Sequence, residues 1–135
     1  MNAILDTGPW VALIDRSESK HKVSTDWLQA YKGKLFTTEA ILTEVLYLLN
    51  FSIIAQTAAL DFVLHSVVEI VPSTKSSLKK SQELMIKYND LPMDFADATL
   101  VTLAVDTGVY KIVTFDHKDF SIYKPAKQKH FQLMP

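Results

Sequence analysis

The sequence predicts an α/β fold, a three-layer α/β/α sandwich around a mainly parallel central sheet of four to five strands. Short apolar runs typical of strands alternate along the chain with longer segments of helical periodicity. Parallel strands need such long crossovers, and the helices in them cover both faces of the sheet. Acidic residues follow two of the apolar runs, at the edge where open α/β sheets hold their ligands.

The first third of the chain supplies one strand and a helical pair. Residues 3–5 form a short apolar run, and residues 9–15 and 23–31 carry apolar side chains at helical spacing. Gly33 follows the second helix, as Gly108 follows a later one, and glycine is common where helices end. We therefore expect a crossover of two helices after the first strand.

The middle of the chain repeats this arrangement. Residues 35–37 are expected to form the second strand, residues 38–50 and 54–65 a second helical pair, and residues 67–71 the third strand. The apolar segment 45–60 contains several polar residues and has an acid at each end, so a membrane span is not expected.

The last third supplies two more helices and two strands. The helices are residues 76–88 and 94–106, separated by a loop that contains Pro92. Residues 111–115 form a strong strand pattern and residues 131–134 a weaker one. All helices then lie between strands, as a parallel sheet requires.

Composition indicates one domain, residues 1–135, in a reducing compartment. A chain of this length buries enough surface to fold alone. It has no cysteine, which excludes disulfides, thiolate zinc sites and cysteine nucleophiles. The start lacks the basic region of a signal peptide, and we expect a soluble, cytoplasmic protein.

Net charge alone indicates no partner, but the lysines are unevenly distributed. The formal charge is -1, from 14 basic and 15 acidic residues. The C-terminal part contains five lysines: Lys111, Lys118, Lys124, Lys127 and Lys129. They would suit a phosphate backbone, and a solvated surface segment explains them equally well.

Two acidic residues follow expected strands. Asp6 comes directly after residues 3–5 and precedes Thr7-Gly8-Pro9, a turn and helix start. Asp116 follows the strand pattern of residues 111–115. Parallel strands would bring both carboxylates to one crevice. Each could instead cap a turn through backbone hydrogen bonds.

Two further acids interrupt apolar helices. Glu44 lies in a helix that is nearly all apolar, and Asp97 lies in another that is rich in alanine. A carboxylate buried in such surroundings is costly without a partner, and a bound metal ion would serve as one. Asp94 precedes Asp97 by three residues, on the same helical face, so helix capping explains this pair equally well.

Together, these segments resemble the PIN-domain ribonucleases, in particular the VapC-type toxins of bacterial toxin–antitoxin modules. The opening ILDTGPWVALID, residues 4–15, resembles the start of that family. Residues 43–45 and 97–104 resemble the segments that carry its second and third acids. Residues 114–120, TFDHKDF, are similar to its closing block, with Asp116 in the fourth acidic position. The segments follow in the family's order and cover nearly the whole chain.

The resemblance implies a metal-dependent endoribonuclease that hydrolyses RNA phosphodiester bonds. Its catalytic and metal-binding residues would be Asp6, Glu44, Asp97 and Asp116. Auxiliary roles beside the metal fall to Asp94, Asp119, Thr7 and Thr114, and either of these two aspartates could replace Asp116. An all-oxygen ligand set favours Mg²⁺ or Mn²⁺ over zinc. Whether one or two ions bind stays open.

The resemblance also implies an RNA substrate, a cognate antitoxin and a homodimer. Phe51, Ile53 and Ile54 cluster at an expected helix–helix turn, where they would mark an interface or be buried beneath the neighbouring helix. The alternative function is a catalytically weak PIN-like module that binds RNA or a partner. A dehalogenase-type phosphatase is disfavoured, because Gly8 stands where a second aspartate is needed. A receiver-like domain is disfavoured because Asp6 has no acidic neighbour.

Overall fold

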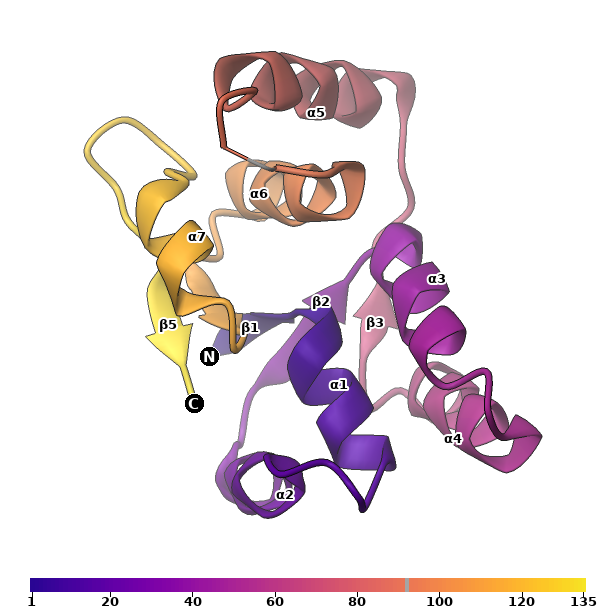
Figure 1. Ribbon diagram of the computed structural model, residues 1–135. Coiled ribbons are helices and arrows are strands. Elements are labelled where there is room, and N and C mark those ends of the chain that lie inside the picture. The colour runs from indigo at the N-terminus through magenta and orange to yellow at the C-terminus, as the bar shows by residue number, and fades with distance from the viewer. Residues whose placement is uncertain (92) are drawn as a thin grey trace.

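The computed structural model describes residues 1–91 and 93–135, and within them the chain forms a five-stranded parallel sheet with helices on both faces (Figure 1). The strand order is β3-β2-β1-β4-β5, and every pairing is parallel. This confirms the predicted three-layer α/β sandwich. Pro92, which we expected in a loop, lies outside the described residues.

All predicted strands and helices are present, with ends that shift by a few residues. The strands are β1 (Asn2–Leu5), β2 (Lys34–Thr37), β3 (Glu69–Ile70), β4 (Lys111–Val113) and β5 (Gln132–Met134). The helices are α1 (Thr7–Ile14), α2 (His21–Ala30), α3 (Glu39–Leu48), α4 (Ile53–Leu64), α5 (Lys75–Lys87), α6 (Phe95–Thr107) and α7 (His117–Ile122). Among the described residues, no helix is long and apolar enough to cross a membrane.

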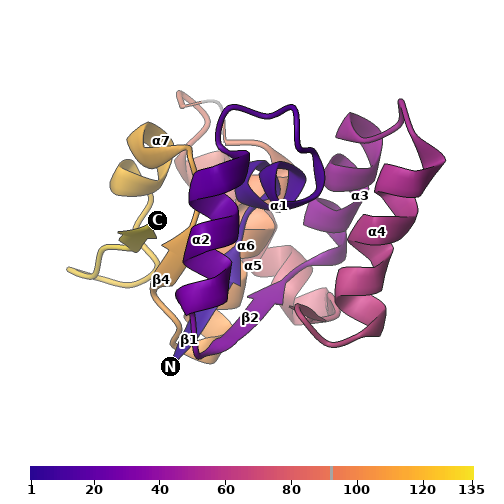
Figure 2. The same ribbon diagram turned by 90° about the horizontal axis from the view of Figure 1, so that it is seen from below.

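The helices divide between the two faces of the sheet according to the strands that they connect. Helices α1 to α4 connect β1, β2 and β3; in Figure 2, α1 and α2 lie in front of the sheet, and α3 and α4 lie to its right. Helices α5 and α6 connect β3 to β4 and cover the opposite face (Figure 1). The strand order therefore reverses between β1 and β4, and open α/β sheets bind ligands in the crevice at the carboxyl ends of the strands that flank such a reversal.

The core surrounds β1, which is the central strand. Ala3, Ile4 and Leu5 are fully buried, because helices cover both faces of the strand. Trp10 is also fully buried, whereas Trp27 and Tyr31 stack on one another at the edge of the core, with ring centroids 4.6 Å apart. These aromatic rings therefore contribute to packing.

Helix α7 is the one described helix that the sequence did not predict, since Asp116 was expected to follow a strand and, as the alternative, to cap a turn. The helix has six residues, too few to show apolar periodicity. It is held by its cap, in which the Asp116 carboxylate accepts a hydrogen bond from the Asp119 N–H at 3.2 Å, and by the fully buried Phe120. A helix this short depends on tertiary contacts.

The two glycines that were predicted to end helices have different roles. Gly108 has a φ of 72° and ends α6 in the left-handed conformation, as predicted. Gly33 does not end a helix, because α2 ends at Ala30 and is followed by extended backbone at Tyr31. Instead, a Cβ at Gly33 would collide with the Met1 carbonyl. The prediction for Gly33 was wrong because close approach of two chain segments is not visible in a local pattern.

Helix α3 is less buried than its apolar sequence predicts. Within the helix, only Ile41 and Val45 are buried, while Tyr47 is 72% exposed and Leu48 is 51% exposed. The helix contacts α1, α6 and α4, and these contacts leave Tyr47 and Leu48 exposed. Glu44 is consequently half-buried rather than enclosed by apolar side chains.

Candidate functional site

The four acids named from the sequence come from elements that meet at the carboxyl ends of β1 and β4. Asp6 is the first residue after β1, and its N–H donates to the Val113 carbonyl of β4 at 3.0 Å. Asp116 caps the amino end of α7, three residues after β4. Glu44 comes from α3 and Asp97 from the first turn of α6. The crevice between β1 and β4 therefore collects carboxylates from both halves of the chain.

Asp6 is held by hydrogen bonds to both carboxylate oxygens. It is 8% exposed, and its Oδ1 accepts from the Thr7 N–H at 2.8 Å, as an N-cap does. Its Oδ2 accepts from the hydroxyl of the fully buried Thr114 at 2.7 Å. The Thr114 hydroxyl also accepts from the Asp116 N–H at 2.9 Å. Thr114 thus links the segments that follow β1 and β4.

Glu44 is tied to the same group by Thr7. The Thr7 hydroxyl donates to Glu44 Oε2 at 2.7 Å, while the Thr7 N–H donates to Asp6. One residue therefore fixes two acids that lie 38 positions apart in the sequence. Both threonines singled out from the sequence are hydrogen-bond donors to acids of this site.

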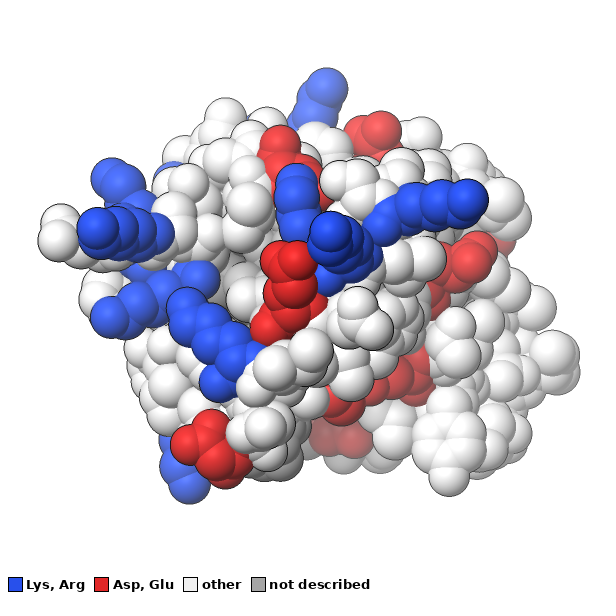
Figure 3. All heavy atoms as spheres, turned by 90° about the horizontal axis from the view of Figure 1, so that it is seen from above, with Lys and Arg blue, Asp and Glu red and all other residues white. Residues whose placement is uncertain are grey.

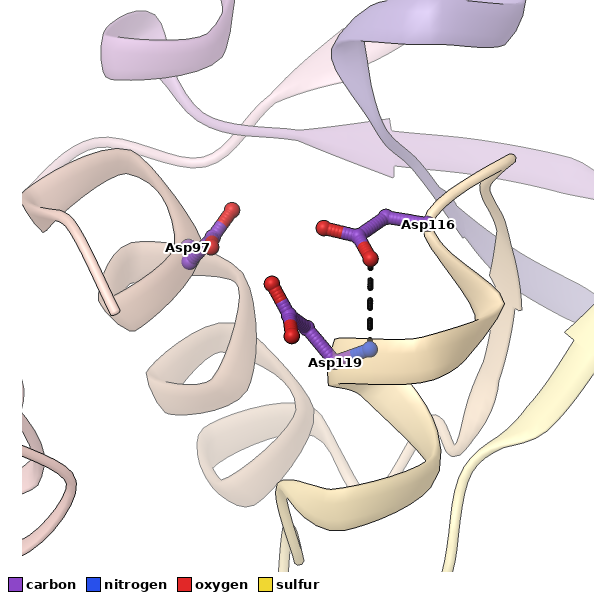
Figure 4. Close-up of side chains that lie close together, drawn as sticks. All are labelled: Asp97, Asp116 and Asp119. Carbon is purple, nitrogen blue, oxygen red and sulfur yellow. Dashed lines mark hydrogen bonds between the residues drawn. The ribbon is translucent and has the colours of Figure 1, made fainter. Parts of the chain in front are cut away.

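Asp97, Asp116 and Asp119 form a second group, which we call the aspartate trio. Each contributes a carboxylate oxygen, and the three oxygens lie within 4.8 Å of one another. Figure 4 shows Asp97 approaching from α6 and the other two from the start of α7. Three converging carboxylate oxygens are a donor set that suits a hard divalent cation.

Asp97 has the most perturbed carboxyl group of the site. Burial raises its pKa to about 8, with further increases from the charge of Asp94, then Asp6, Asp116 and Glu44. Each of these influences favours the protonated form. A divalent cation would favour the ionised form and so offset the repulsion.

Asp6 and Asp119 show the same tendency more weakly. Burial raises the pKa of Asp6 to about 6, although hydrogen bonds from Thr114 and Thr7 oppose the rise. Burial and the neighbouring charge of Asp116 raise the pKa of Asp119. The acids of both groups therefore share one electrostatic environment.

Asp94 and Asp119, the two auxiliary aspartates named from the sequence, have different roles in the structure. Asp94 is exposed and caps α6, accepting from the Asp97 N–H at 2.9 Å, so its capping role is as expected. Asp119 joins Asp97 and Asp116 because α7 turns it toward them. The spacing of three residues between Asp116 and Asp119 is the signal in the sequence, since it matches a cap and the third residue of a helix.

Lysines lie on the surface beyond the acids. In Figure 3, basic side chains gather over the face that α5 covers, and α5 itself contributes Lys75, Lys79, Lys80 and Lys87. One of these, Lys80, pairs with Asp106. In the C-terminal segment, Lys124, Lys127 and Lys129 are all exposed. The exposed lysines Lys124, Lys127 and Lys129 are thus available to a polyanion, although solvation explains them as well.

The chain is similar over its whole length to known proteins of one kind. A family model described as PIN domain matches residues 3–125. Ribonuclease VapC26 of Mycobacterium tuberculosis is 24% identical over 134 residues, which cover 98% of this chain and 99% of that protein.

Solved structures show the same fold. Mycobacterium tuberculosis VapC20, described as a sarcin–ricin loop cleaving toxin, superposes with a TM-score of 0.79 at 22% identity, over 86% of this chain and 91% of that one. VapBC2 from Rickettsia felis, bound to a promoter DNA fragment, superposes with a TM-score of 0.69 at 16% identity, over 100% of both chains. The architecture is therefore shared at low sequence identity.

Proposed function

Because this chain belongs to the PIN-domain family, we propose that it is a metal-dependent endoribonuclease and the toxin of a toxin–antitoxin pair. In this proposal residues 1–135 form a single nuclease domain. The observation that carries it is the aspartate trio, three carboxylate oxygens within 4.8 Å of one another beside the buried Asp6. A binding module would gain nothing from such mutually repelling groups.

The proposed ligands are the acids of the crevice. Asp97, Asp116 and Asp119 would hold Mg²⁺ or Mn²⁺ together with Asp6 and Glu44, directly or through water. A bound cation would supply Lewis-acid chemistry there, namely activation of a water and stabilisation of negative charge on the phosphate oxygens. The protein keeps the carboxylates in place through Thr7 and Thr114.

Protonation is the competing state of these carboxylates. Burial raises the pKa of Asp97 to about 8 and that of Asp6 to about 6, which favours their protonated forms below those pH values when no cation is bound. Binding of a cation therefore releases protons, and its affinity rises with pH through this range. This dependence is a property of the chain's own carboxyl groups.

An RNA substrate is supported by the relatives and by the lysines. One relative is named a ribonuclease, and one structural neighbour is described as cleaving the sarcin–ricin loop. Lys124, Lys127 and Lys129 follow α7, whose first turn carries Asp119, and would contact the phosphate backbone on the way to the site. Cleavage should therefore weaken as salt concentration rises.

A cognate antitoxin and a second copy of the chain are the proposed protein partners. One structural neighbour is a toxin–antitoxin complex from Klebsiella pneumoniae. Where α3 meets α4, Phe51, Ile53 and Ile54 are 66%, 71% and 78% exposed. Exposed apolar groups of this kind mark interaction surfaces. Replacing Ile54 by aspartate should weaken both self-association and binding of the antitoxin. Light scattering of the variant alone measures the first, and light scattering of the variant mixed with the protein of a neighbouring reading frame measures the second.

The decisive experiment uses purified protein and a mixed RNA pool. We expect cleavage with Mg²⁺ or Mn²⁺, none with EDTA, and none for Asp97→Asn, which keeps the side chain's size but removes its charge. Cleavage that persists in EDTA would overturn the metal dependence. Protein that binds RNA but never cuts it with either metal would instead be the binding module considered from the sequence.

A further inference from the structure

The ammonium group of Lys20 is held over an aromatic ring next to the acidic site. Lys20 directly precedes α2, and its Nζ lies 5.6 Å from the centroid of the Phe115 ring. A cation above the face of an aromatic ring is attracted by the ring electrons. Lys20 is exposed and forms no ion pair with an acid of the described residues. The ring therefore places this charge, and the ammonium group stays available to a ligand.

The Phe115 ring lies among the residues that hold the acids in place. Phe115 stands between Thr114, whose hydroxyl donates to Asp6 at 2.7 Å, and Asp116 of the aspartate trio. The ring also lies against Gly8 in the first turn of α1, where an added Cβ would be only 3.1 Å from Phe115 Cδ2. The missing side chain at Gly8 thus permits this packing. The ring therefore lies between the start of α1 and the segment after β4, the two segments that supply Asp6 and Asp116.

The backbone at Lys20 is fixed at the end of the sheet that carries the acids. Figure 2 shows α2 beginning toward the same end of the molecule as α7, whose first turn carries Asp119. The next residue, His21, ties this start to α1, because its Nδ1 lies 2.7 Å from the Ala12 carbonyl oxygen and must donate to it. Only the Lys20 side chain then has to move to reach a ligand at the crevice.

An RNA strand that enters the crevice is repelled by its acids. Phosphate groups and ionised carboxylates carry charges of the same sign. A divalent cation offsets only part of the charge of the acids in the site, which are Asp6, Glu44, Asp97, Asp116 and Asp119. A basic group at the edge of the crevice would offset the repulsion for phosphates on either side of the one that is cleaved.

We propose that the Lys20 ammonium binds a phosphate group of the RNA backbone that neighbours the scissile phosphate, and so guides the strand into the crevice. This inference rests on the proposed function. In the free protein the Phe115 ring holds the ammonium group, and a phosphate offers it a charged hydrogen-bond acceptor instead. Lys20 is thus a substrate-binding residue on the α2 side of the crevice.

The test compares Lys20→Gln with Lys22→Gln, since each removes one positive charge at the start of α2. Lys22 is the matched control, because its side chain is 87% exposed and pairs with Asp26 on the same helix at 3.1 Å. Fluorescence anisotropy of a labelled single-stranded RNA measures binding in EDTA, where we expect no cleavage. Lys20→Gln should bind about 10-fold more weakly at low salt, as when a charged hydrogen bond is lost. Lys22→Gln should bind like the wild type.

The salt dependence identifies the lost contact as a phosphate contact. The slope of log affinity against log salt concentration should become less steep by about 0.7 for Lys20→Gln, the value for one phosphate of a single strand. The slope should not change for Lys22→Gln. Both variants should have the melting temperature of the wild type, because both lysines are exposed.

Cleavage with Mn²⁺ provides a second measurement. For Lys20→Gln the KM for RNA should rise by about the same 10-fold while kcat stays near that of the wild type, because a contact outside the reacting group changes binding alone. Lys20→Arg keeps the charge and should keep most of the affinity. A fall in kcat with an unchanged KM would contradict a role in binding the strand.

The role of the ring is tested with Phe115→Leu, which keeps an apolar side chain but removes the aromatic face. We expect RNA binding in EDTA to weaken by about 2- to 5-fold, the contribution of an exposed cation–π contact. Combined with Lys20→Gln, the same change should cause no further loss, because both variants remove one interaction. A full additional loss would mean that the ring contacts RNA itself and does not act by placing Lys20.

The inference and the proposed function fail in different ways. If Lys20→Gln and Lys22→Gln lose affinity equally, RNA responds only to overall charge, so the inference is wrong and the proposed nuclease function stands. If Lys20→Gln binds and cuts RNA like the wild type, the inference is again wrong. If the wild-type protein neither binds nor cuts RNA, the proposed function fails, and this inference fails with it.

Discussion

The two halves of the acidic crevice are held in different ways. Asp6 and Glu44, which we call the anchored pair, accept three hydrogen bonds from Thr7 and Thr114. The aspartate trio, defined above, accepts one backbone bond, from the Asp119 N–H to Asp116, among the described residues. The anchored pair is thus organised before any ligand binds, whereas the trio is held together against its own repulsion.

This difference suggests a division of labour. Hydrogen bonds to a carboxylate favour its ionised form, and for Asp6 they partly offset burial. Asp97 has no such compensation, so its pKa rises to about 8. We expect the anchored pair to keep the carboxylates of the site in place. We expect the repulsion within the trio to account for most of its affinity for a cation. The following experiments separate these roles.

The largest effect should come from the trio. Asp97→Asn should reduce RNA cleavage by about 100-fold or more, exceeding the loss typical of a residue that only supports a ligand. Near pH 7 the same variant should melt at a higher temperature than the wild type without metal, because the wild type must take up a proton at Asp97 on folding, burial having raised its pKa to about 8, and asparagine needs none. Cleavage rates and melting curves test the two statements separately. A variant that loses activity and also has a lower melting temperature would contradict the claim that the carboxyl groups of the trio destabilise the metal-free protein.

The next largest effect should come from the anchors. Thr114→Val removes the hydroxyl that Asp6 and the Asp116 N–H share, leaving buried groups unsatisfied. We expect the free energy of unfolding to fall by about 1–3 kcal/mol, measured by urea titration. Thr114→Ser keeps the hydroxyl and is the matched control. Equal losses in both variants would show that the methyl group matters and the hydrogen bonds do not.

A smaller effect should appear in the pH dependence of metal-free stability. The folded-state pKa values of Asp6 and Asp97 are raised to about 6 and about 8, so the folded protein binds more protons than the unfolded one above pH 4. Stability should therefore fall as pH rises from about 4 to about 8, and level off above that. Melting temperatures measured with EDTA test this. In Asp97→Asn the fall should end near pH 6.

The smallest effect should come from Asp94, which acts on the trio only through its charge. Asp94→Asn keeps a capping side chain, so stability should be nearly unchanged, whereas Asp94→Ala should cost about 1 kcal/mol. In both variants the pH at which Mn²⁺ binding is half-maximal should decrease by a fraction of a pH unit. A loss of Mn²⁺ affinity as large as that of Asp97→Asn would instead make Asp94 a ligand.

Local patterns were sufficient for most of the fold. The apolar run at β1 and the glycine that ends α6 were recognisable because each reflects a local requirement, burial on both faces and a left-handed residue. Patterns failed where the cause was distant. Gly33 is required by Met1, and α7 is stabilised by packing of Phe120 on the core.

The sequence by itself determined the α/β architecture and the acids that reach the crevice. It did so because strand ends and helix starts depend on residues that are close together in the sequence. Only the tertiary structure decided how those acids divide. It tied Asp6 and Glu44 to threonines and brought a carboxylate oxygen of Asp119 within 4.8 Å of one of Asp97. The physical reason is that hydrogen bonds, burial and repulsion depend on distance in space, and separation along the chain does not encode it.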